Sequence, residues 1–271
     1  MRTSVRRLAP IALALVILGS MVPAALAADP AGTSEAAISA AERDALTLTN
    51  KRRTAAGLRA LRLDPRIAAL ARDRAEYMAR TGSFSHTQSG GTSVFDLINA
   101  EDIAWYGAGE IIAWNTAASL DYSASFAVQG WMNSPTHKSI LMSKGYNYVG
   151  FGLAIANDGK RYWAGVYLKG PDRTAAYARI KSSASRSVSS TKTKVYFAWG
   201  GADIKLQVLT SGLRYFETQR RVDGGAWGTY GTTTATSVIR YWWKGHTWDF
   251  RMRARDRAGN WGPWQYRTVK T

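Results

Sequence analysis

The stretch DPRIAALARDRAEYMART, residues 64–81, decides the fold of the first half of the chain. Asp64 suits a helix N-cap, and Pro65 suits the first helical position, where its missing amide hydrogen costs nothing. Apolar residues then recur at helical spacing, and Gly82 follows as a stop signal. The pattern predicts an amphipathic helix whose apolar face must pack against another layer.

A second helix is expected just before this one, over about residues 40–54. Ser39 followed three residues later by Glu42 has the spacing of a capping box, and Gly57 lies just beyond the expected end. Two amphipathic helices therefore precede the first histidine.

Further elements follow in residues 93–168. Ser93 is expected to cap a short helix in VFDLINA, and a longer helix is expected over about residues 117–132. The stretch VGFGLAIANDGKRYWAGVYL predicts two strands joined by a turn at residues 157–159. Helices followed by a hairpin predict an α+β domain, which we place at residues 39–170.

The pattern changes after residue 170. Residues 171–192 are rich in serine, threonine and basic residues, which predicts an interdomain linker. Residues 193–271 then contain short alternating runs separated by turn residues: KVYFAW, DIKLQVLT, YFETQRRV, SVIRYW and WDFRMRARD. This spacing predicts an all-β immunoglobulin-like sandwich as the second domain.

The first 27 residues have the composition of a secretory signal peptide. Arg2, Arg6 and Arg7 precede a short apolar run, and small residues then lead to an expected cleavage site after Ala27. We therefore expect a secreted protein whose mature form has no transmembrane segment. The chain has no cysteine, which excludes disulfides, thiolate ligands and a cysteine nucleophile and favours a bacterial origin.

The net charge of +17 is concentrated near the C-terminus. Residues 181–271 contain sixteen Lys and Arg against five Asp and Glu, so an anionic partner is expected to meet this part of the chain. In FRMRARD, Arg251, Arg253 and Arg255 alternate with apolar residues, which predicts three guanidinium groups on one exposed face. We expect cell-wall or other anionic polymers as partners, and not nucleic acid if the protein is secreted. The alternative is a solvated charged face with framework tryptophans.

Three polar residues lie in segments flanked by glycine or serine: His86 in SFSH, Glu110 in GAGE and His137 in SPTHKS. Two imidazoles and a carboxylate form a ligand set for zinc or another divalent cation with one coordination position left open. The alternative is that each histidine is a structural residue. The third histidine of the chain, His246, has no evident ligand partner in the sequence and is expected to be an ordinary turn residue.

Residues 41–170 resemble the CAP superfamily of cysteine-rich secretory, antigen 5 and pathogenesis-related proteins, in its bacterial SCP-like form. The resemblance is carried, in order, by LTNKRRTAAGLRALRLDPRIAALARDRAEYMA, FSH, GAGEIIA, WMNSPTHKSIL, and VGFGLA with RYWAGVY. It implies an α-β-α sandwich with a cleft that holds two histidines and two acidic residues, where some members bind a divalent metal.

The resemblance assigns the cleft histidines to His86 and His137 and the first acid to Glu110. The place of the second acid falls on Ser134, and the family's asparagine after the glutamate is here Ile111. Ser134 directly precedes Pro135, so it also suits the N-cap of the helix that carries His137. Four other acids are candidates to replace the missing one in space: Asp96, Glu101, Asp102 and Asp121.

Aromatic residues of the first domain, among them Trp131, are expected to form the core and the cleft wall. About residues 193–271 resemble a fibronectin type III-like module, carried by VYFAW, YFETQRRVDGGAW and WDFRMRARDRAGNWGPW. Seven of the eleven tryptophans lie there, and those beside turns are candidate platforms for sugar rings.

Two functions follow from these patterns. The first is a secreted CAP-domain binding module at the cell envelope, with a metal-capable His/Glu cleft and a basic sandwich that anchors it. The alternative is a metal-assisted hydrolase of peptide or ester substrates, in which a bound metal activates water. That reaction needs a general base, and the loss of the second acid makes an enzyme the weaker hypothesis.

Overall fold

The computed structural model describes residues 33–271, so the predicted signal peptide lies outside the described residues. The chain divides into two compact units. Unit 1 extends to Gly170 and includes Leu206–Val208, and unit 2 comprises Pro171–Lys205 and Leu209–Thr271. Within residues 33–271, no helix is long and apolar enough to cross a membrane.

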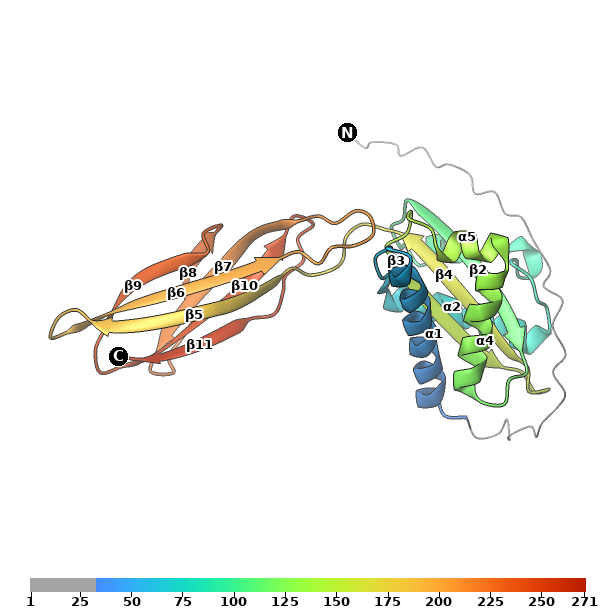
Figure 1. The fold of residues 1–271 in the computed structure, drawn as a ribbon, viewed down its shortest axis with the longest axis horizontal. Coiled ribbons are helices and arrows are strands. Elements are labelled where there is room, and N and C mark those ends of the chain that lie inside the picture. Colours follow the sequence, from blue (N-terminus) through green and yellow to red (C-terminus); the bar gives the residue numbers. More distant parts are fainter. Residues whose placement is uncertain (1–32) are drawn as a thin grey trace. The chain divides into compact units, whose positions relative to one another are not determined.

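Unit 1 contains one four-stranded sheet with the strand order β1-β3-β4-β2, which leaves β2 at an edge (Figure 1). The short β1 pairs with β3 in parallel, and the other neighbours are antiparallel. The elements of unit 1, in chain order, are α1 (Glu35–Ala55), β1 (Arg62–Leu63), α2 (Pro65–Thr81), the 3₁₀ turn η2 (Ser89–Gly91), α3 (Val94–Ala100), β2 (Gly107–Asn115), α4 (Leu120–Asn133), α5 (Pro135–Leu141), β3 (Tyr148–Ile155) and β4 (Arg161–Lys169).

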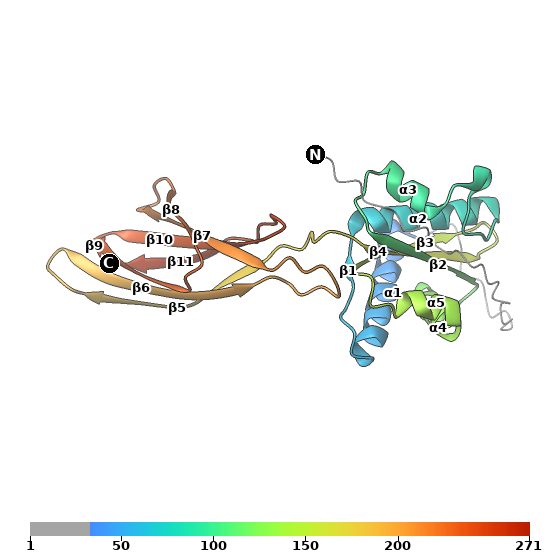
Figure 2. The same cartoon turned by 90° about the horizontal axis from the view of Figure 1, so that it is seen from above.

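Helices cover both faces of this sheet. Figure 2 shows α2 and α3 on one side and α1, α4 and α5 on the other. Each side has its own buried apolar cluster, one containing Ile67 of α2 and Ile98 of α3, the other containing Ala45 of α1 and Trp131 of α4. Unit 1 is therefore a three-layer α-β-α sandwich, as the family resemblance of the sequence implied.

The glycines of VGFGLA explain how closely α2 approaches the sheet. A Cβ atom on Gly150 would lie 2.2 Å from the backbone nitrogen of Ala68, and one on Gly152 would lie 2.2 Å from the carbonyl carbon of Ala71. Because no side chain fits in that space, glycine at these two positions lets the helix backbone contact the strand directly.

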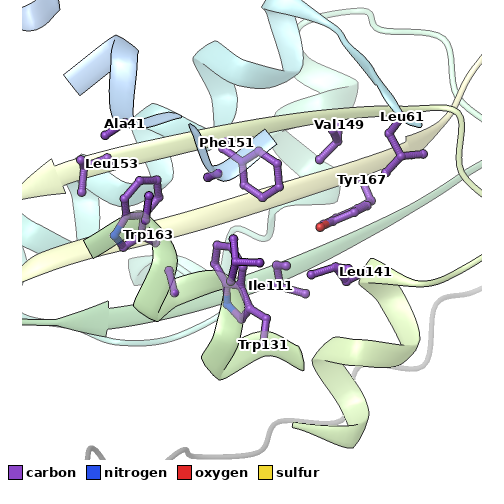
Figure 3. Close-up of a cluster of buried hydrophobic side chains, with 14 residues drawn as sticks. Ala41, Leu61, Ile111, Trp131, Leu141, Val149, Phe151, Leu153, Trp163 and Tyr167 are labelled. Atoms are coloured by element: carbon purple, nitrogen blue, oxygen red, sulfur yellow. The ribbon is translucent and has the colours of Figure 1, made fainter. Parts of the chain in front are cut away.

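The opposite side of the sheet is filled by large aromatic residues (Figure 3). Trp131 stacks on Phe151 with ring centroids 5.8 Å apart, and Phe151 meets Tyr167 edge-on at 6.1 Å. All three side chains are buried. Such rings remove a large apolar area from water, so this cluster fixes the positions of α4 and α5 on the sheet.

Two helix starts follow the sequence prediction. At α2, the Asp64 side chain accepts a hydrogen bond from the Arg66 amide, and Gly82 ends the helix in the left-handed conformation. At α3, Ser93 and Asp96 form a full capping box. The prediction of helices with these ends is therefore confirmed.

The start of α1 was predicted five residues too late. The N-cap is Ser34, whose side chain accepts from the Ala37 amide, and Ser39 lies inside the helix. Ser39 Oγ and the Glu42 carboxylate instead bind the Arg72 guanidinium of α2. Ser39 and Glu42 have the spacing of a capping box, but their side chains make a tertiary contact between α1 and α2 instead.

Unit 2 consists of two antiparallel sheets, with strand orders β11-β10-β7-β8 and β5-β6-β9 (Figure 1). Buried residues of both sheets share one apolar cluster, which includes Phe197 of β6 stacked on Phe250 of β10 at 4.4 Å. The strands are β5 (Tyr177–Ser187), β6 (Lys192–Ala202), β7 (Leu213–Val222), β8 (Gly228–Thr233), β9 (Ser237–Trp243), β10 (Thr247–Asp256) and β11 (Gln265–Lys270).

Two sequence expectations for this unit differ from the structure. Half of the predicted linker at residues 171–192 is strand β5, which pairs with β6 along its length. Its polar composition reflects an edge strand whose residues beyond Ile180 are mostly exposed. The run DIKLQVLT, residues 203–210, is a loop, because the Asp203 carboxylate accepts bonds from Ser211 Oγ and the Gly212 amide.

Candidate functional site

Glu110 is the centre of a buried polar cluster on the edge strand β2. It lies inside the strand, with its side chain 3% exposed. Its Oε1 accepts a hydrogen bond from Arg74 Nε at 2.8 Å, and its Oε2 lies 2.7 Å from His86 Nδ1. The carboxylate thus links the α2 layer to the segment that carries His86.

Arg74 of α2 neutralises this carboxylate inside the protein. Its side chain is fully buried, and Nη2 donates to the Ser85 carbonyl oxygen at 2.7 Å. One guanidinium group therefore fixes both Glu110 and the backbone next to His86. The result is an ordered imidazole on an otherwise irregular segment.

His137 approaches from the other side of the edge strand, on α5. It is 4% exposed, and its Nδ1 has no hydrogen-bond partner among the described residues. Burial, and then the nearby His86, lower the pKa of His137 from its ordinary value of 6.5. The imidazole is therefore neutral at pH 7, which is the form that binds metals and accepts protons.

Two features hold α5 against β2. Arg53 of α1 donates from Nη1 to the carbonyl oxygens of Leu141 and Ser143, at 2.7 and 2.9 Å, so a cation lies at the C-terminal end of α5. At Gly109, an added Cβ would lie 2.8 Å from the Tyr146 hydroxyl and 3.2 Å from Ile140 Cγ2. The glycine before Glu110 therefore allows α5 to approach the strand.

The structure brings the two histidines together. The rings of His86 and His137 lie 6.5 Å apart between centroids and are tilted by 46°. Since Glu110 occupies Nδ1 of His86, Nε2 is the nitrogen of that ring left for a ligand. His137 adds a second imidazole, whose buried Nδ1 has no hydrogen-bond partner among the described residues.

Two of these three side chains, the histidines, fit as ligands of a divalent cation such as zinc. Imidazole nitrogens are good zinc ligands, and a carboxylate bonded to the far nitrogen of a ligating histidine is a common second partner. Within residues 33–271, however, ligand atoms of His86, Glu110 and His137 do not all lie within 4.8 Å of one another. The geometry favours the two histidines as ligands and Glu110 as the group that orients His86.

The other predicted cleft residues have different surroundings. Trp131 is fully buried and donates from Nε1 to the Ile112 carbonyl oxygen at 3.0 Å, so it belongs to the core. Ser134 occupies the N-cap position of α5, but its side chain makes no capping bond, and its buried Oγ has no partner among the described residues. Ile111 is also buried in the core.

The candidate second acids do not join this cluster. Asp96 belongs to the α3 capping box with Ser93. In the described part of the chain, none of Asp96, Glu101, Asp102 and Asp121 bonds to His86 or His137. Outside unit 1, His246 pairs with Asp223 at 2.6 Å.

The predicted arginine ladder is present on β10, but its guanidinium groups are half-buried and already bonded. Arg251 donates to Gln219, Arg253 to Glu217 and Arg255 to the Tyr215 hydroxyl. Tryptophan rings lie over all three arginines, 4.0 to 5.1 Å from the guanidinium carbons: Trp227, Trp261 and Trp264. The alternation predicted from the sequence is confirmed, and the exposure of the groups is lower than expected.

A second buried group of carboxylates lies in unit 2. Asp172, Asp203 and Asp256 place oxygens within 4.8 Å of one another, and each residue is at most 7% exposed. Their hydrogen-bond donors are neutral groups of Thr174, Ser211, Gly212 and Asn260. Desolvation, followed by neighbouring charges that include Asp172, raises the pKa of Asp203.

Sequence reasoning missed Arg74 and Arg53, which position the two histidines. Arg74 carried a usable signal, because it lies on the apolar face of α2 with Ile67, Leu70 and Met78. A cation on such a face needs a buried anion, so Glu110 was a predictable partner.

Unit 1 is an α-β-α sandwich in which a histidine pair lies beside the glutamate of an edge strand. Residues 46–167 match the family model of the cysteine-rich secretory protein family, CAP. Residues 46–167 are therefore a CAP domain, as the resemblance of the sequence implied.

Two curated Bacillus subtilis proteins are similar over this region. The uncharacterized protein YkwD is 28% identical over 120 residues, which are 44% of this chain and 45% of that protein. The uncharacterized membrane protein YlbC is 34% identical over 112 residues, 41% of this chain and 31% of that protein. The chain thus spans less than half the length of either relative.

Among crystal structures, an extracellular Bacillus anthracis protein containing an SCP domain aligns with a TM-score of 0.42 and 23% identity. The alignment covers 48% of this chain and 41% of that chain.

Proposed function

We propose that the protein is a binding module of the cell envelope whose CAP domain holds a divalent cation, zinc being the leading candidate, at His86 and His137. The observation that carries the proposal is the pair of imidazoles beside Glu110, one bonded to the carboxylate and the other buried and neutral. Glu110 keeps Nδ1 of His86 occupied, so that Nε2 faces a ligand.

A cation bound there would act as a Lewis acid toward an oxygen-rich ligand. The residues of the chain would supply the rest. Arg74 holds the Glu110 carboxylate in place, and Arg53 holds the helix that carries His137. The site is therefore preorganised by two buried cations that do not themselves contact the ligand.

Zinc titration by calorimetry tests the metal half of the proposal. We expect one zinc per chain for the wild type and at least a tenfold loss of affinity for both His86→Ala and His137→Ala. His246→Ala is the matched control, because it removes the histidine of unit 2 and leaves the cluster intact. Equal zinc binding by all four proteins would contradict the site.

The envelope half rests on the predicted signal peptide and on the charge of unit 2. Residues 181–271 carry sixteen basic and five acidic residues, which favours attraction to the anionic polymers of a cell wall. Arg251, Arg253 and Arg255 remain candidates for that contact through their exposed edges. Seven strands in two antiparallel sheets support a fibronectin type III-like assignment for unit 2.

Co-sedimentation of the full chain with purified cell wall tests the anchoring. We expect binding at low salt that weakens as the ionic strength rises, because exposed charges are screened within about 10 Å at 0.1 M salt. Binding that is absent, or that does not depend on salt, would contradict an electrostatic anchor.

A metal-assisted hydrolase is the second candidate, and one observation favours it. His86 and His137 lie close enough to offer two imidazole ligands, and a zinc ion held by them would keep open positions where a water molecule could be activated. Protein confirmed to be zinc-loaded should then cleave members of a peptide and ester panel. A lack of turnover across the panel would contradict the hydrolase and would be consistent with the binding role.

A further inference from the structure

The outer face of the β5-β6-β9 sheet combines exposed aromatic rings with basic side chains. The strand registers pair Lys192 with Trp243, Lys194 with Tyr241 and Tyr196 with Ile239. Arg186 of β5 lies opposite Lys194 on the same face. We call these seven residues the aromatic-basic face.

The apolar side chains of this face are unusually exposed for their size. Trp243 is 54% exposed, Tyr241 58% and Ile239 45%, while Tyr196 is 38% exposed. Isolated exposed rings are common, but contiguous ones on a flat sheet are typical of binding surfaces. Strand geometry places neighbouring side chains of one face about 5 Å apart across strands and 7 Å along them.

The cations of this face have no anionic partner among residues 33–271. Strands β5, β6 and β9 contain no aspartate or glutamate. Among the described residues, neither Arg186, Lys192 nor Lys194 forms an ion pair, and the Lys192 ammonium instead lies 4.7 Å from the centroid of the Trp243 ring. The positive charge is therefore available to an external anion.

The arginine ladder of β10 differs in this respect. Arg253 is bonded to the Glu217 carboxylate, and Arg251 is bonded to Gln219 and stacked on Trp227 and Trp264. The charges of the ladder are therefore partly compensated by contacts within unit 2. The aromatic-basic face is thus the stronger candidate for an anionic ligand.

We propose that the aromatic-basic face binds an anionic polysaccharide, with sugar rings stacked on Tyr241 and Trp243 and acidic groups on Lys192, Lys194 and Arg186. The proposal rests on the envelope role proposed above and assigns the polymer contact to a surface. Sugar rings present apolar C–H faces that suit aromatic platforms, and the cations between the platforms select a charged polymer over a neutral one.

The binding of four soluble polymers to the full chain tests the assignment. Polygalacturonate has sugar rings and carboxylates, dextran has rings without charge, polyglutamate has charge without rings, and single-stranded DNA has charged phosphates and stacking bases. We expect polygalacturonate to bind at least tenfold more tightly than polyglutamate, and dextran not to bind measurably. Preference for polyglutamate or for DNA would overturn the proposal.

Variants locate the contact. We expect the double variant Tyr241→Ala and Trp243→Ala to lose about tenfold in affinity for polygalacturonate, and Lys192→Gln with Lys194→Gln to lose a similar factor. Tyr122→Ala and Lys144→Gln, which remove an exposed ring and an exposed cation of unit 1, are the matched controls. Far-ultraviolet circular dichroism and the thermal midpoint verify that each variant is folded.

The outcomes separate this proposal from the envelope role. If wild-type protein fails to bind purified cell wall, the envelope role fails. If wild-type protein binds cell wall and polygalacturonate, but the face variants bind equally well, only the assignment to this face fails. A loss confined to Arg251→Gln in the β10 ladder would likewise overturn it.

Discussion

The two units each bury a carboxylate centre, and the two centres are compensated in opposite ways. Glu110 in unit 1 meets the fully buried Arg74 and the imidazole of His86. Asp172, Asp203 and Asp256 in unit 2 meet amide, hydroxyl and carboxamide donors, and among the described residues none of the three forms an ion pair with a lysine or arginine.

The difference shows how a buried charge is related to function. In unit 1 the chain itself neutralises the carboxylate with Arg74, and the imidazoles of His86 and His137 lie near one another at this cluster. In unit 2 the carboxylates tie loops together through backbone donors, and their mutual repulsion remains as a cost. The first centre joins α2 to β2 through the contact of Arg74 with Glu110, and the second joins loops of unit 2 under electrostatic repulsion.

Arg74→Ala is expected to give the largest effect, because it leaves Glu110 buried without its cation. The loss of stability should be about 3–5 kcal/mol, as for other broken buried ion pairs. Urea denaturation measures it, and the double variant Arg74→Met with Glu110→Leu should recover much of the loss. A loss below about 1 kcal/mol would mean that the pair is not buried as described.

Arg253→Lys should have an intermediate effect, because this arginine pairs with Glu217 on the half-exposed surface of unit 2. Lysine keeps the charge but loses the two guanidinium bonds to Glu217 and the stacking on Trp261. We expect a loss of about 1–2 kcal/mol in the unfolding free energy. A variant as stable as the wild type would show that only the charge matters there.

The pH dependence of stability should report His137. Its folded-state pKa is lowered, so below pH 6.5 the unfolded chain binds a proton that the folded protein resists. Stability from this group is complete above pH 6.5 and decreases on acidification, by at most about 1.4 kcal/mol per pH unit. Urea midpoints between pH 5 and 7.5, in chelator, should fall less steeply for His137→Gln. An unchanged slope would contradict the buried neutral imidazole.

Asp203→Asn should produce the smallest change and the opposite sign. Because the folded-state pKa of Asp203 is raised, its ionisation above the ordinary pKa of 3.8 costs stability that a neutral side chain avoids. At pH 7 we therefore expect a slightly higher thermal midpoint for the variant. A lower midpoint would show that the bonds to Ser211 and Gly212 outweigh the repulsion.

Most of unit 1 could be predicted from local patterns. The caps at Asp64 and Ser93 and the hairpin around residues 157–159 depend on neighbouring residues, and the structure confirms them. The early start of α1 could not be found in this way, because Ser39 and Glu42 are used by Arg72 of another helix.

The sequence could predict which residues form the candidate site, but not how they are arranged in space. His86 and His137 come from opposite sides of the edge strand, and the approach of α5 depends on Arg53 and Gly109. Strand β5 was missed for a related reason, since an edge strand with exposed serines has little apolar alternation. Packing across layers decided each of these features.

Nitrogen NMR of the three histidines during a zinc titration tests the central claim most directly. We predict that the resonances of His86 and His137 shift together and saturate at one zinc per chain, while Nδ1 of His86 stays hydrogen-bonded to Glu110 and His246 is unaffected. Resonances of His86 and His137 that do not respond, or a response limited to His246, would contradict the account.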